Sequence, residues 1–294
     1  MKSGKCPLTV AIIAVVLFFC TLGSWADSRN ATSVIDKDMP FKAGGTLWVI
    51  AEFQEVTITA KPVETVKIKI VQEATDFAAK SKLADYLPTF VQMGGNDFIY
   101  LNHIKERVEP EQLEKKTMPT FTANLNLPGI LGRVSIEMPP GMNVSVITYS
   151  GKCVLRGDFG EAKVRFQTNT GRIDIKGAMQ DLETQTSYGP VGVELTREIR
   201  SAEVNIDRGR VEFDGTAVAM AVQSQSANVT VTLAQKWSGE ATIETSSGSI
   251  QLRDVTGAPE PDGNHIRIHG DPNGPKYAIK TWSGNVFLKK KLYY

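Results

Sequence analysis

Thr168-Asn-Thr-Gly-Arg-Ile-Asp-Ile175 is one copy of a pattern that recurs along the second half of the chain. The other clear copies are Thr148-Tyr-Ser-Gly-Lys-Cys-Val-Leu155, Thr186-Ser-Tyr-Gly-Pro-Val-Gly-Val193, Ile206-Asp-Arg-Gly-Arg-Val-Glu-Phe213, Ser224-Gln-Ser-Ala-Asn-Val-Thr-Val231, Thr245-Ser-Ser-Gly-Ser-Ile-Gln-Leu252 and Thr281-Trp-Ser-Gly-Asn-Val-Phe-Leu288. Their fourth residues are 20, 18, 20, 18, 21 and 36 positions apart, and the last interval has room for a further copy around Asn264. A sustained period near ~20 residues is the signature of a repeat architecture.

Each copy also alternates between apolar and polar residues. Ile173 and Ile175 flank Asp174, and Val211 and Phe213 flank Glu212. This period of two predicts a strand with one buried face, and the glycine before it supplies the bend. One such unit cannot bury its own apolar face, so the units are expected to stack.

The sequence therefore predicts an all-β fold, in which residues 128–294 form a β-solenoid (β-helix-like) of about eight coils with repeats of ~20 residues. The Thr, Ser or Ile three residues before each turn position is expected to form a column, able to link hydroxyls along the stack. An antiparallel sandwich of short strands is the alternative that regular turn signals also allow.

Residues 1–26 have the features of a secretory signal peptide. Lys2 and Lys5 precede an apolar run from Leu8 to Cys20, and Ser24-Trp25-Ala26 is a cleavage site before Asp27. The apolar run spans 13 residues, which is short against the roughly 20 that cross a bilayer. Cleavage is the prediction, with a retained anchor or a lipid-modified Cys20 as the alternatives.

Charge and cysteine content narrow the possible functions further. The formal charge of +1 gives no electrostatic case for nucleic acid. Without residues 1–26 the chain has 33 − 2 = 31 basic and 32 acidic residues. Its one remaining cysteine, Cys153, cannot form an internal disulfide, and it occupies an inward position, so it is expected to be a small buried hydrophobe.

The first half of the chain is less regular. Residues 27–40 are predicted to be a flexible lead, and residues 41–127 a smaller, mainly-β N-terminal region. Thr75 to Leu87 is its single helix candidate, with Asp76 at its start and Pro88 after its end. The mixed charges of residues 103–118 indicate a solvated loop.

Two segments resemble a putative-adhesin family, a domain of unknown function found in bacterial envelope β-solenoid proteins. They are Phe41-Lys-Ala-Gly-Gly-Thr-Leu-Trp-Val49 with the following Glu55-Val-Thr-Ile-Thr59, and Ile136-Glu-Met-Pro-Pro-Gly-Met-Asn-Val-Ser-Val146 leading into the first repeat. The resemblance covers residues 41–71 and 119–288. It implies an exported periplasmic, cell-surface or extracellular protein and brings no catalytic motif.

The sequence offers few candidates for chemistry. His265 and His269 would lie about 13 Å apart on one strand, too far to share a metal ion, and His103 stands alone. Lys152, Arg172 and Arg210 share one predicted outward column, and Asp174 and Glu212 share the next. A polysaccharide lyase-like enzyme would need such acids and bases to converge on one groove.

We therefore predict no catalytic, cofactor-binding or metal site. The predicted function is that of an exported, non-enzymatic adhesin or scaffold module. Its partner would be an envelope or surface protein or glycan and no nucleic acid, and the membrane would be involved only through an uncleaved signal segment. A carbohydrate-active enzyme and an envelope-stress sensor are the alternatives.

Overall fold

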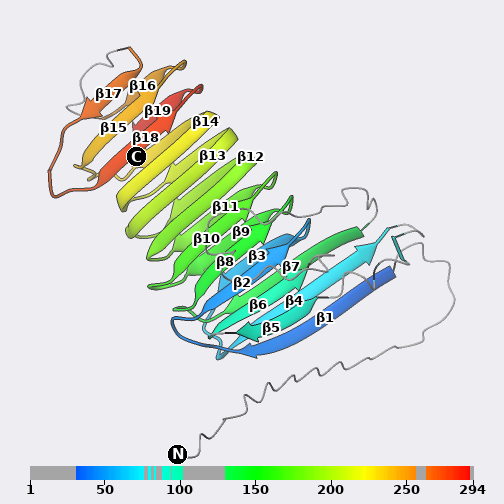
Figure 1. Cartoon of the computed structure of the whole chain (residues 1–294). Coiled ribbons are helices and arrows are strands. Elements are labelled where there is room, and N and C mark those ends of the chain that lie inside the picture. The colour runs from blue at the N-terminus through cyan, green and yellow to red at the C-terminus, as the bar shows by residue number, and fades with distance from the viewer. Residues whose placement is uncertain are drawn as a thin grey trace, which may run out of the picture.

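The strands of the described chain form a single sheet. The computed structural model describes residues 31–75, 79–80, 83, 88–93, 95–101, 130–255 and 263–291. These residues contain nineteen strands, joined by hydrogen bonds into one sheet (Figure 1).

The strand bounds define the elements used below. In chain order the strands are β1 Ala31–Pro40, β2 Thr46–Ala51, β3 Glu55–Ala60, β4 Thr65–Ala74, β5 Thr89–Met93, β6 Asn96–Leu101, β7 Ile130–Met138, β8 Asn143–Thr148, β9 Cys153–Asp158, β10 Lys163–Thr168, β11 Ile173–Ala178, β12 Asp181–Leu195, β13 Ile199–Asp214, β14 Ala217–Leu233, β15 Glu240–Thr245, β16 Ile250–Arg253, β17 His265–Ile268, β18 Lys276–Thr281 and β19 Val286–Lys290.

The middle of the sheet consists of consecutive repeats that pair in parallel. β8 pairs with β10 and β9 with β11, and the longer strands β12, β13 and β14 continue the sheet. Ile173 illustrates the register, since it lies between Cys153 and Val191 on the neighbouring strands. The inward residues from both halves of each repeat belong to one apolar cluster. The sheet therefore curls around a single core.

The turn inside a repeat depends on its glycine because neighbouring backbones approach closely there. A Cβ on Gly171 would lie 2.1 Å from the carbonyl oxygen of Gly151. The Gly171 N–H donates to Thr168 Oγ1 at 2.9 Å, and the Gly151 N–H donates to Thr148 Oγ1 at 3.0 Å. The threonine column thus closes its own turns, in addition to any links along the stack.

The N-terminal strands are part of the same sheet. β2 lies between β6 and β8, and β3 lies between β7 and β9. β4 pairs antiparallel with both β1 and β7. The flexible lead predicted over residues 27–40 is therefore wrong from Ala31 onward, where the ten-residue strand β1 begins.

The last repeats do not follow sequence order. β14 is followed across the sheet by β18 and β19, and only then by β15 and β16. In Figure 1 red β19 lies between yellow β14 and orange β16. Ser224 Oγ donates to Thr281 Oγ1 at 2.8 Å across this junction. The segment after Asn264 forms β17, which pairs antiparallel with β15 and is not a further coil.

These pairings show that the predicted β-solenoid of about eight coils is wrong. Each unit of a solenoid stacks on the unit before it, whereas here the order breaks at both ends and antiparallel strands share the sheet. The architecture is one curled, mixed β-sheet.

Three predicted segments fall largely outside the described residues. Of the helix predicted over Thr75 to Leu87, the structure describes only residues 75, 79, 80 and 83, and Ala79 and Lys80 among them are helical. The predicted signal peptide, 1–26, and the charged run, 103–118, are not described.

Candidate binding groove

The outward face of the repeats is hollowed into an open groove of about 1090 Å³. β9, β11, β19 and the second halves of β12, β13 and β14 line it. Gly192 lies between Asp174 and Glu212 on neighbouring strands, and its lack of a side chain leaves the space between their carboxylates open. The charged lining residues are Lys152, Arg156, Asp158, Arg172, Asp174, Lys176, Glu194, Glu212, Asp214 and Lys289.

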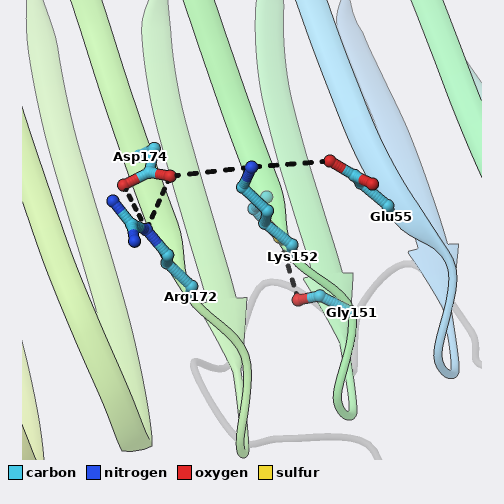
Figure 2. A network of polar contacts seen from close by, with 6 residues as sticks. Glu55, Gly151, Lys152, Arg172 and Asp174 are labelled. Atoms are coloured by element: carbon cyan, nitrogen blue, oxygen red, sulfur yellow. Dashed lines mark hydrogen bonds and ion pairs between the residues drawn. The ribbon is translucent and has the colours of Figure 1, made fainter.

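A network of ion pairs crosses the strands at one end of this groove (Figure 2). Arg172 Nε donates to Asp174 Oδ1 at 2.7 Å. Lys152 Nζ lies 3.9 Å from the other oxygen of Asp174 and 3.6 Å from Glu55 Oε1. The network therefore joins β11, the residue before β9, and the N-terminal strand β3.

Every carboxylate that lines the groove has a basic partner. Beyond Asp174, the pairs are Asp158 with Arg197 at 3.3 Å, Glu194 with Lys176 at 2.8 Å, Glu212 with Arg210 at 3.3 Å and Asp214 with Lys291 at 3.1 Å. Exposed pairs of this kind each stabilise a fold by only about 0–1 kcal/mol. Their effect is to hold charges in fixed rows on a rigid sheet.

Two lining cations lack such a partner among the described residues. Arg156 lies at one end of an outward row and Lys289 at the other, with Glu194 and Asp214 between them. Their strands are five steps apart, or about 24 Å at the usual strand spacing. The groove thus has a free positive charge at each end and neutralised carboxylates in its middle.

Of the charged residues singled out from the sequence, all but Arg210 line the groove, and they are spread along it. Lys152 and Arg172 lie on adjacent repeats, whereas the repeat between those of Arg172 and Arg210 has Pro190 at the equivalent position. Asp174 and Glu212 share a column, as predicted, but lie two strand spacings apart, about 10 Å. The structure does not bring these acids and bases together around one point.

Further groove residues were missed by the sequence analysis. Lys176, Glu194 and Asp214 form the next outward row, two residues beyond Asp174 and its equivalents. The same alternation could have identified them. Glu55 does not line the groove but pairs with Lys152, and its role had no such signal because its strand was assigned to a separate region.

Cys153 lies beneath the network and is fully buried. Burial raises the pKa of its thiol, which disfavours the thiolate that a nucleophile needs. Its inward placement agrees with the sequence prediction.

The histidines do not form a site in the part of the chain that is described. His265 lies opposite Glu244 on β15, His269 follows the end of β17, and both are exposed. His103 is outside the described residues. No group of three His, Cys, Asp or Glu residues within the described ranges is placed to hold a metal ion. No helix within those ranges has the length and apolar character needed to cross a membrane.

Comparison with known proteins gives only distant likenesses. No protein-family model matches the chain, and no curated protein matches it significantly. A putative adhesin from Bacteroides fragilis NCTC 9343 is similar at 13% identity and a TM-score of 0.46, over 88% of this chain and 97% of that one. A putative lipid binding protein from Parabacteroides distasonis ATCC 8503 is similar at 11% identity and a TM-score of 0.41, over 90% of this chain and 98% of that one. A putative cell adhesion protein from Clostridium sporogenes ATCC 15579 is similar at 11% identity and a TM-score of 0.34, over 89% of this chain and 100% of that one.

Solved structures of adhesin-like proteins are thus among those that the chain resembles, at low identity. The specific putative-adhesin family suggested by the sequence is not confirmed. At these TM-scores the likenesses carry no argument about function, which has to come from the groove itself.

Proposed function

We propose that this protein is an exported, non-catalytic adhesin or scaffold module of the cell envelope and that the charged groove is its binding face. The observation that carries the proposal is the pairing of every carboxylate in the groove with a base. An acid–base catalyst needs a group that is free to exchange a proton at the reacting atom. Charges held in fixed rows instead suit recognition of a partner with complementary charges. Export rests on the signal features of residues 1–26.

A charge-swapped pair tests the groove without removing an ion pair. Lys176→Glu combined with Glu194→Lys keeps the contact between β11 and β12 but reverses the charge pattern. Lys61→Glu with Glu137→Lys makes the same exchange in a pair that does not line the groove. We expect purified protein to sediment with isolated envelopes, the groove swap to lose this retention and the control swap to keep it.

The same experiment can contradict the proposal. Equal retention of both swapped proteins would show that the groove is not the binding face. In cells, N-terminal sequencing of the envelope fraction should find a chain that begins at Asp27, whereas an intact Met1 on protein confined to the cytoplasm would overturn export.

A carbohydrate-active enzyme is the second candidate, because the groove does combine acids and bases. Incubation with acidic polysaccharides, followed by ultraviolet detection of unsaturated products, decides between the two. Product formation that is lost in Asp174→Asn would favour the enzyme.

A further inference from the structure

Three neighbouring segments form an uncharged edge that contrasts with the groove. They are residues 225–228 within β14, the turn 282–285 between β18 and β19, and the turn 246–249 between β15 and β16, which we call the neutral edge. These segments are adjacent because β18 and β19 lie between β14 and the pair β15 and β16. They contain only amide, hydroxyl, indole, alanine and glycine residues, whereas the equivalent segment of β13, residues 207–210, reads Asp-Arg-Gly-Arg.

Trp282 is the exposed aromatic residue of the neutral edge. Trp282 is 71% exposed, whereas Trp48 and Trp237 are each 7% exposed. Its backbone is fixed on both sides: its N–H donates to the Ser224 oxygen, and its oxygen accepts from the Ser247 N–H, each at 3.0 Å. A single exposed apolar side chain is common on protein surfaces, so its surroundings decide what it means.

Two asparagines of the neutral edge, Asn228 and Asn285, offer hydrogen-bond donors that the described residues do not use. Asn228 Oδ1 accepts from the Asn285 N–H at 3.0 Å, and Asn285 Oδ1 accepts from the Ser249 N–H and hydroxyl at 3.0 and 2.9 Å. These bonds hold the amide oxygens. Each Nδ2 group can donate twice and has no partner among the described residues. Both asparagines are exposed, one strand spacing apart, about 4.8 Å.

We propose that the neutral edge binds an uncharged glycan. A sugar ring presents C–H groups on one face, which suit the electron-rich face of an indole, and hydroxyls at its rim, which suit amide donors and serine hydroxyls. These segments carry no ionic side chain, so contact with them desolvates no charge. Arg208 and Arg210 lie one strand away, opposite Ser226 and Asn228. The site is separate from the charged groove, so it does not depend on the function proposed for that groove.

Tryptophan fluorescence of the mature chain, residues 27–294, reports on this site directly. Trp48 and Trp237 are buried, so a collisional quencher such as acrylamide acts mainly on Trp282. Oligosaccharides of glucose, mannose, galactose and N-acetylglucosamine serve as uncharged probes, and polygalacturonate as an anionic one. We expect at least one uncharged probe to protect Trp282 from quenching and to bind in calorimetry.

Two variants test the contacts, and a third is the control. Trp282→Ala should weaken binding more than about tenfold, as loss of an aromatic anchor does. Asn285→Asp keeps an oxygen for Ser249 but replaces the free donor, and should weaken binding by roughly threefold to tenfold. Tyr188→Ala alters an exposed aromatic residue on β12, outside the neutral edge, and should leave affinity unchanged.

Several outcomes would overturn the proposal. They are binding of the anionic probe alone, protection by none of the uncharged probes, or an affinity that survives both Trp282→Ala and Asn285→Asp. Circular dichroism of each variant confirms that the sheet is intact.

Discussion

At the scale of single residues, neighbours on one strand meet opposite environments. Ile173 is fully buried between the strands above and below it, whereas the Asp174 side chain is 28% exposed and paired with Arg172. This contrast follows from the period of two along a strand, and it was predictable from the sequence alone.

The first prediction compares substitutions at these two positions. Ile173→Asp buries a carboxylate without a partner and should cost several kcal/mol, a large part of a domain's stability. Asp174→Ile loses surface ion pairs and should change the free energy of unfolding by no more than about 1 kcal/mol. Thermal melts of both variants measure the difference. Equal losses would mean that the strand register is wrong.

The second prediction concerns Cys153. Because the thiol is buried and its pKa is raised, it should react with a thiol reagent only after unfolding. Cys153→Val replaces it with an apolar side chain of similar size and should cost less than about 1.5 kcal/mol. Rapid labelling of the native protein would indicate an accessible, reactive site instead.

The third prediction concerns Asp181 and pH. Its partial burial acts to raise its pKa, but hydrogen bonds from Arg200 and Ser201 outweigh that effect and lower the pKa below the ordinary 3.8. The ionised carboxylate therefore contributes stability above pH 3.8, and this contribution is lost as the pH falls through the lower, folded pKa.

The measurement is the melting temperature of the native protein and of Asp181→Asn across this range. Their difference should be constant near neutral pH and shrink in acid. In an Arg200→Gln background the pH dependence of that difference should be reduced. A difference that grows as the pH falls would contradict the assignment.

At the scale of elements, the glycines of the repeats differ in the space around them: Gly171 lies at a turn and Gly192 within strand β12. A Cβ on Gly171 would meet a backbone oxygen at 2.1 Å, whereas on Gly192 its nearest contact is the Asp174 carboxylate at 3.4 Å. The fourth prediction is that Gly171→Ala destabilises the sheet strongly. Gly192→Ala should be neutral or stabilising by up to about 1 kcal/mol, through the unfolded chain. Chemical denaturation of the pair measures this, and similar losses would refute the close approach at the turn.

The strands of the repeats could be predicted from sequence because each carries its own alternation. Ile173 to Ile175 and Val211 to Phe213 are examples, and the rows of Asp174 and Glu212 followed from the same pattern. The groove they line could not be predicted, because its shape depends on the curl of the sheet and on the missing side chain at Gly192. The pairing of β3, which carries Glu55, with β9 could not be predicted either, because pairing between distant segments leaves no local signal in the sequence.

At the scale of the whole molecule, the order in which the repeats pair across the sheet could not be predicted from the sequence. Thr245 to Leu252 and Thr281 to Leu288 have the same pattern of inward residues, so either could pair with β14. Packing of the complete chain places the later segment first. This order also assembles the neutral edge, because it puts the Trp282 turn between residues 225–228 of β14 and the serine-rich turn 246–249.

Disulfide cross-linking tests this arrangement most directly. Thr230 on β14 is the register partner of Phe287 on β19, which in turn pairs with Gln251 on β16. Thr230 and Gln251 are therefore two strand spacings apart, about 10 Å, beyond the roughly 7 Å between Cα atoms that a disulfide can bridge. In a mature Cys153→Val background, Thr230→Cys with Phe287→Cys should form an intramolecular disulfide on mild oxidation, and Thr230→Cys with Gln251→Cys should not. Cross-linking of the second pair in place of the first would show that the repeats stack in sequence order and would contradict the structure described above.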